Sequence, residues 1–218
     1  MRLLAVAVAF LITPIDAVGA QRASFRMPGI EFELPIPAGY CLPQGAQADA
    51  AQLLAAADSL NVTHLTLVRC EESPEAATDY NLIKTPRQAL LTTIERRAFL
   101  DSVGEAFATT ELTQLMESGS LNSQSEEGIS QVIGRQIDIS GSIRPLGRDQ
   151  VCAYVGGTVQ MQSNEVSYDI SMGACMTIVS SRLLFIYAYG PASGSAGVAR
   201  LMVRARRLAE SISETSSR

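Results

Sequence analysis

The fold is decided by the stretch VCAYVGGTVQMQSNEVSYDISMGACMTIV (residues 151–179), which has the pattern of a β-hairpin with Ser163 and Asn164 at its tip. In the register that this tip sets, one face pairs apolar with apolar residues and the other pairs polar with polar. A slip by one residue would mix both faces. The apolar pairs are Val151–Met176, Ala153–Ala174, Val155–Met172, Val159–Tyr168 and Met161–Val166, and the polar pairs are Thr158–Asp169, Gln160–Ser167 and Gln162–Glu165. The stretch therefore predicts antiparallel strands at residues 150–162 and 165–179.

The same register places Cys152 directly opposite Cys175, at a separation that a disulfide can bridge. Four cysteines allow three connectivities. Register and cysteine chemistry together predict Cys152–Cys175, which leaves Cys41–Cys70. The alternative is four free buried thiols. A four-residue loop at the tip, or a bulge at the paired glycines of residues 156–157, would alter this register.

The surrounding segments extend the hairpin into a larger sheet. Residues 182–189 are apolar on both faces, which requires a layer of structure on each side of the sheet. Isoleucines alternate with polar residues at 133–143, and a turn is expected at residues 144–147. A final helix at residues 195–213 carries a buried stripe at helical spacing, formed by Val198, Leu201, Met202, Ala205, Leu208, Ala209 and Ile212. We expect an α+β protein with an antiparallel sheet of about five to six strands packed between helices, a three-layer α/β/α sandwich.

The N-terminal half has weaker patterns. Strands are expected at residues 30–36 and 62–70, with a helix at 46–60 between them whose buried stripe is Leu53, Leu54, Ala57 and Leu60. The segment from Thr85 to Gln88 has the spacing of a capping box and predicts a helix from Pro86 to about Arg97. This helix continues or restarts toward Phe107, a short helix follows at residues 109–117, and residues 118–128 form a surface loop.

The first 20 residues have the pattern of a secretory signal peptide. Arg2 precedes an apolar run at residues 3–15, and small residues at Val18 and Ala20 suit cleavage before Gln21. The alternative is a membrane anchor, but crossing a bilayer takes roughly 20 residues, more than this run provides. We therefore expect a signal peptide at 1–20 and a single domain at 21–218, periplasmic or secreted. No membrane insertion is expected after cleavage.

Composition and motifs exclude several functions. The formal net charge of -5 disfavours nucleic-acid binding, which needs a basic face. Lys84 is the only lysine beside 16 arginines, as in proteins encoded by GC-rich bacterial genomes. No cofactor or metal motif is present. His64 is the only histidine, and it lies within a predicted strand on the face of Thr66 and Val68. Without a G-x-S-x-G elbow or a second histidine, this position favours a structural role.

One loop and one helix face have the residues of an anion site. Gly190, Ser193, Gly194 and Ser195 lie between a strand and a helix N-terminus, where free backbone N–H groups can hold an anion. The alternative is a flexible connection in which a serine caps the helix. Arg200, Arg204 and Arg207 follow on the helix, where a solvated face is the simpler interpretation. The acidic residues 71–79 are interpreted as a solvated loop.

Two short stretches resemble the exported PsbP-like proteins. FELPIPAGY (residues 32–40) is similar to the opening strand and Pro-x-Gly-aromatic corner of that family, and SRLLFIYAY (181–189) precedes a polar loop and a terminal amphipathic helix, as it does there. The resemblance implies an antiparallel sheet between helices and a non-catalytic accessory or binding role. It assigns no functional residue.

Three functions are consistent with these observations. The first is an exported, disulfide-bonded module without catalysis of its own, which binds a protein or small-molecule partner that the sequence does not identify. The second is a hydrolase that uses His64 with a serine and an acid. The third is a structural protein of the cell envelope. Export, the cysteine pairs and the missing catalytic motif favour the first.

Export makes a direct prediction about the mature N-terminus. Protein recovered from the periplasm or medium of an expressing bacterium should begin at Gln21, because the small residues before it suit signal peptidase. Intact-mass measurement of the oxidised protein checks this. A chain that retains its first 20 residues would contradict it.

Overall fold

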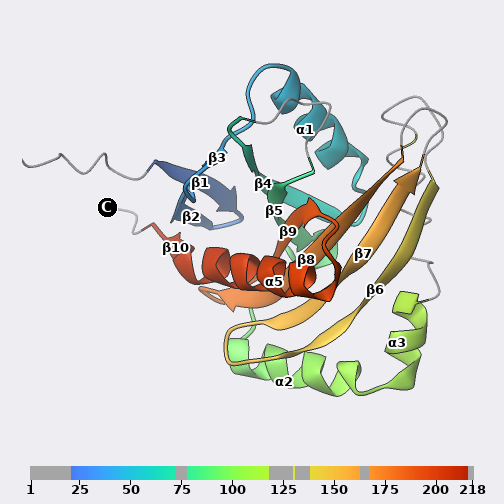
Figure 1. Cartoon of the computed structure of the whole chain (residues 1–218). Coiled ribbons are helices and arrows are strands. Elements are labelled where there is room, and N and C mark those ends of the chain that lie inside the picture. Colours follow the sequence, from blue (N-terminus) through green and yellow to red (C-terminus); the bar gives the residue numbers. More distant parts are fainter. Residues whose placement is uncertain (1–20, 72–77, 118–129, 131–137, 163–166, 216–218) are drawn as a thin grey trace, which may run out of the picture.

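The computed structural model describes residues 21–71, 78–117, 130, 138–162 and 167–215. These residues form two antiparallel sheets and several helices (Figure 1). The smaller sheet has the order β1-β2-β10, and the larger has the order β3-β4-β5-β9-β8-β7-β6. The strands are β1 (Arg22–Met27), β2 (Ile30–Pro35), β3 (Tyr40–Cys41), β4 (Asn61–Arg69), β5 (Tyr80–Pro86), β6 (Asp138–Arg148), β7 (Ala153–Gln162), β8 (Ser167–Val179), β9 (Arg182–Pro191) and β10 (Ser213–Glu214). The helices are α1 (Ala46–Ala57), α2 (Arg96–Phe107), α3 (Thr110–Glu117) and α5 (Gly194–Ser211), with a 3-10 turn, η2, at Arg87–Ala89.

The predicted α+β class with an antiparallel sheet between helices is confirmed. Helix α5 packs against β8 and β9, and α2 packs against the opposite face, where Phe107 contacts the cluster of Val155, Met172 and Ala174. The main sheet has seven strands rather than five or six, and the hairpin β1–β2 adds a second sheet beside α5. None of the helices in the described ranges is both long and apolar enough to cross a bilayer.

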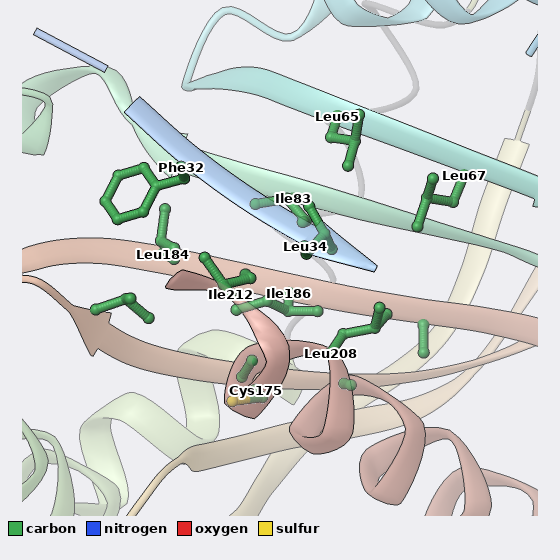
Figure 2. Close-up of a cluster of buried hydrophobic side chains, with 14 of the residues drawn as sticks. Phe32, Leu34, Leu65, Leu67, Ile83, Cys175, Leu184, Ile186, Leu208 and Ile212 are labelled. Carbon is green, nitrogen blue, oxygen red and sulfur yellow. The ribbon is translucent and has the colours of Figure 1, made fainter. Parts of the chain in front are cut away.

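The largest hydrophobic core lies on the α5 face of the main sheet. Figure 2 shows side chains from β2, from the main sheet and from α5 meeting in one cluster. Phe32 and Leu34 of β2 are fully buried there, as are Leu184 and Ile186 of β9. The buried residues of β2 therefore contact both α5 and the main sheet, and the two sheets share this core.

The hairpin β7–β8 forms, but its register differs from the predicted one by two residues. Ala153, rather than Val151, lies opposite Met176, and Tyr154 lies opposite Cys175. Because the side-chain period of a strand is two, the shift leaves every residue on its predicted face. Pairing extends to Gln162 and Ser167, and the predicted tip at residues 163–164 lies outside the described residues.

A pair of glycines explains the observed register. It places Gly156 directly opposite Gly173 on the α5 face, where the helix lies against the sheet. A Cβ atom on Gly173 would lie 2.6 Å from the backbone nitrogen of Met202, and one on Gly156 would lie 2.7 Å from Val198. The predicted register would have separated the two glycines, so that α5 could not approach this closely. The glycines serve helix packing, and the β7–β8 pairing continues through them without a bulge.

Both predicted disulfides are present, with Cα–Cα distances of 5.2 Å for Cys41–Cys70 and 5.1 Å for Cys152–Cys175. Cys152 precedes β7 in a turn closed by Asp149, whose carboxylate accepts the backbone N–H groups of Val151 and Cys152. The turn brings its sulfur to Cys175 although the two residues are not opposite each other. The other bridge joins β3 to the end of β4.

Several local predictions are wrong. The capping-box segment lies at the end of β5, a strand that the sequence analysis missed, and α2 begins only at Arg96. Thr85 is buried in β5 and donates its hydroxyl to the carbonyl of Leu183, so it cannot cap a helix. The turn expected at residues 144–147 is an irregularity within β6. Helix α1 exposes its predicted stripe, with Leu53 at 52% and Leu54 at 45% exposure. The loop expected at residues 118–128 lies outside the described residues.

The predicted signal peptide at 1–20 and the start of the strand expected at 133–143 lie outside the described residues, and the remaining predicted elements are present. The turn Ser180–Ser181, with both residues at positive φ, joins β8 to β9. Helix α5 begins at Gly194 rather than Ser195 and ends at Ser211. Its stripe is buried as expected at Val198, Leu201, Ala205, Leu208, Ala209 and Ile212, whereas Met202 is half-buried.

The close approach of α5 predicts that Gly173→Ala destabilises the protein by about 2 kcal/mol, because the added methyl group meets helix backbone that cannot move aside. Urea unfolding measures the effect. Gly190→Ala is the matched control, since its Cβ meets only the flexible end of Leu201 at 3.2 Å. Equal stability of the two variants would contradict the role given to Gly173.

Candidate functional site

His64 lies at a bulge in β4 and is held by its surroundings. The register of β4 against β5 shifts between Thr63 and Leu65. The bulge turns the ring toward Phe25, on which it stacks with 5.4 Å between centroids, rather than toward the face of Thr66 where the sequence places it. Its Nε2 atom lies 3.0 Å from the hydroxyl oxygen of Thr85.

The hydrogen bonds around His64 define its tautomer. The Thr85 hydroxyl donates to the carbonyl of Leu183 at 2.9 Å, so its oxygen accepts from the Nε2–H of His64. Burial lowers the pKa of His64 to about 4, which keeps the ring neutral near pH 7. The Thr85 proton is therefore committed to a carbonyl, and among the described residues no carboxylate hydrogen-bonds to the ring. This arrangement is a structural one.

A hollow of about 280 Å³ between α1 and β4 borders His64. Its other lining residues are apolar or uncharged, among them Leu42, Ala48, Ala51 and Thr66. The hollow therefore presents no second acid or base to a substrate. In the described ranges no three His, Cys, Asp or Glu side chains gather in a way that would hold a metal ion.

One residue of the candidate anion loop, Ser193, makes side-chain and backbone contacts within the protein. Gly190 belongs to β9, and Ser193 is the N-cap residue of α5, whose side chain makes no capping hydrogen bond. The Ser193 hydroxyl instead accepts from the guanidinium of Arg200, and its backbone N–H donates to Ser171. Gly194 begins the helix at positive φ, and Ser195 follows within it. The loop thus orients Arg200.

A larger hollow of about 690 Å³ lies along α5, and we call it the α5 groove. One wall is the chain at residues 35–37, where β2 turns toward β3, and the other is the outer face of α5 between residues 199 and 211. Arg200, Val203 and Arg207 recur there at helical spacing and are exposed, so the groove is open to solvent. Figure 1 shows α5 lying across the main sheet and leading into β10, an edge strand of the small sheet next to β2.

Arg204, on the α5 wall, ties the helix to β3, to β9 and to the residue before β5. Its guanidinium pairs with Asp79 at 2.6 Å and donates to the Tyr40 hydroxyl and to the carbonyl of Tyr189. The Tyr40 hydroxyl in turn donates to Asp79 at 2.6 Å. Burial, reinforced by the hydrogen bond to Asp79, raises the pKa of Tyr40 to about 12 and keeps it a donor. The charge of Arg204 is therefore neutralised, and its role is to hold the corner at Tyr40 against the helix.

Arg200 and Arg207 keep their charge. Neither has a carboxylate partner among the described residues, whereas the neighbouring Arg206 pairs with both Asp149 and Glu210. The α5 groove therefore combines two uncompensated cations with the exposed side chain of Val203 and the half-buried Pro35 and Pro37, in a chain whose formal net charge is -5.

In the sequence alone, Arg200, Arg204 and Arg207 have the pattern of a solvated helix face. The opposite wall is missed there, because Ile36 and Tyr40 are distant in sequence from α5. Asp79 was also interpreted as part of a solvated loop, whereas it pairs with Arg204. Two signals were available: the Pro-rich corner at residues 35–37, and the spacing of four and three residues between the arginines.

No protein-family model matches the chain, and neither does any curated protein. Among solved structures, it is similar to the solution structure of cyanobacterial PsbP (CyanoP) from Synechocystis sp. PCC 6803. The likeness covers 92% of this chain and 97% of that one, with 12% sequence identity and a TM-score of 0.39. The resemblance seen in the sequence is thus present in the structure as a weak likeness of fold.

The lowered pKa of His64 predicts a pH-dependent stability. In the unfolded chain the ring protonates near pH 6.5, whereas in the folded protein it protonates only near pH 4. The contribution of the neutral ring to the free energy of unfolding is therefore complete above pH 6.5 and is lost as the pH falls toward 4. Over this interval the free energy of unfolding of the wild type should fall by about 2 kcal/mol more than that of His64→Gln, because the Gln amide stays neutral and can still donate to Thr85. Urea unfolding at several pH values measures both, and the carboxylates common to both proteins cancel. Parallel pH profiles would contradict the burial of a neutral ring.

Proposed function

We propose that this protein is an exported, non-catalytic binding module, and that the α5 groove is the surface on which it binds an anionic partner. The observation that carries the proposal is the pair of uncompensated guanidinium groups, Arg200 and Arg207, beside the exposed side chain of Val203 and the half-buried Pro35 and Pro37. An accessory role in the periplasm or outside the cell is consistent with the predicted signal peptide and with the two disulfides, since such bonds persist in oxidising compartments.

The groove has the composition of a recognition site. Guanidinium groups bind carboxylates, phosphates and sulfonates through paired N–H donors and keep their charge at all physiological pH values. Apolar surface next to them favours ligands that carry both an anionic and an apolar part. The protein has excess negative charge, so most of its surface repels anions. A locally positive groove is therefore the place to which an anionic ligand is attracted.

The architecture keeps the groove in a fixed shape. Cys41–Cys70 ties the corner beside Tyr40 to β4, and the Arg204–Asp79 pair ties it to α5. A site that is already formed before binding loses less conformational entropy when a ligand arrives. His64, in contrast, offers no arrangement for catalysis, because Thr85 is committed to Leu183 and no described carboxylate hydrogen-bonds to the ring.

The proposal is tested with anilinonaphthalene sulfonate, an aromatic anion whose fluorescence rises in apolar sites. Mature protein should bind it, and Arg200→Glu/Arg207→Glu should weaken binding by about tenfold or more, because two charge-assisted contacts become repulsive. The matched control is Arg97→Glu/Arg144→Glu, which changes the net charge equally on exposed arginines of α2 and β6. Thermal unfolding verifies that every variant is folded. Equal probe binding by both double variants would overturn the proposal.

A further inference from the structure

The two guanidinium groups of the α5 groove that lack a carboxylate partner among the described residues are spaced along the helix. Arg200 and Arg207 are seven residues apart, which places them on the same side of α5 and separates them by about 10 Å along its axis. Val203, 49% exposed, lies between them. A ligand with one anionic group can satisfy only one of these arginines at full strength, so the spacing favours a ligand with two.

The opposite wall cannot recognise a ligand through its backbone donors. Pro35 and Pro37 have no N–H group, and the N–H of Ile36 donates to the carbonyl of Gln21 at 2.7 Å. Addition of a peptide as a further β-strand requires free backbone donors on the receiving strand. The donors left at this groove are the arginine side chains, whose preferred acceptors are carboxylates.

The groove is long and open rather than deep. Its α5 wall extends from residue 199 to residue 211, or about 18 Å at the rise of a helix. The outer face between the arginines is exposed, so the groove does not enclose a ligand as a pocket for a small apolar molecule would. Such a shape suits a chain that lies along it with side chains directed toward the helix.

From these features we infer that the α5 groove binds an extended acidic segment of another polypeptide, with two carboxylates three residues apart; this inference rests on the proposed function. Three residues of polyproline II chain span about 9 Å, close to the spacing of Arg200 and Arg207. In polyproline II the first and fourth side chains also point the same way. An apolar residue between the two acids then contacts Val203 and the proline wall.

The test uses fluorescence anisotropy of peptides that carry an uncharged fluorophore. The blocked peptide GEPVEG places two glutamates three residues apart, and GQPVQG is its neutral counterpart. Mature, oxidised protein should bind the acidic peptide at least about tenfold more tightly than the neutral one, and Arg200→Glu/Arg207→Glu should remove this preference. The control Arg97→Glu/Arg144→Glu should retain it. Raising the salt concentration should weaken binding, because the contacts are exposed ion pairs.

The outcomes separate the inference from the proposed function. If the probe binds through Arg200 and Arg207 but the two peptides bind equally weakly, the inference of an acidic polypeptide partner is wrong, whereas the proposed binding function is retained. Phosphatidylglycerol vesicles form a third arm. If they, and not the peptide, compete with the probe for the groove, the partner is an anionic lipid surface and the inference is overturned. If neither probe nor peptide depends on the two arginines, both proposals fail.

Discussion

The close packing of α5 against the facing glycines Gly156 and Gly173 is the constraint on which the remaining structure depends. With hydrogens as side chains on both strands, the helix backbone lies directly on the sheet. This contact sets the register of β7 against β8, the position of the buried stripe of α5, and the space left for β2 beside the helix. Larger side chains at either position would lift α5 away from the core that joins the two sheets.

The α5 groove is a consequence of this placement. With its inner stripe buried, the helix turns Arg200, Val203 and Arg207 outward, toward the corner where β2 ends. That corner is held from two directions, by the disulfide to β4 and by Arg204 with Asp79. Arg200, Arg204 and Arg207 look equivalent in the sequence, but only Arg204 has a carboxylate partner among the described residues. Of the three arginines, Arg204 is thus used within the structure, and Arg200 and Arg207 lie on either side of it.

Local pattern accounted for much of the fold. The alternation of residues 151–179, the doubly apolar strand after it and the amphipathic last helix each predicted the observed element, because each buries its own apolar face. The errors arose where distant contacts decide. The register follows from a glycine pair that only α5 explains. Thr85 looks like a cap and is instead a buried strand residue bonded to Leu183. Leu53 and Leu54 belong to a stripe with helical spacing, but both are exposed because no described element packs against them.

The candidate site was less predictable than the fold for the same physical reason. A helix face with three arginines is solvated in most proteins, since exposed cations rarely need a partner. What distinguishes this face is the wall opposite it, which comes from residues 35–37, and the acid that neutralises Arg204, which comes from the start of β5. Periodicity describes one element at a time, whereas a groove is a property of two. The charge left on Arg200 and Arg207 has meaning only once the carboxylates within reach are known, and that requires the tertiary structure.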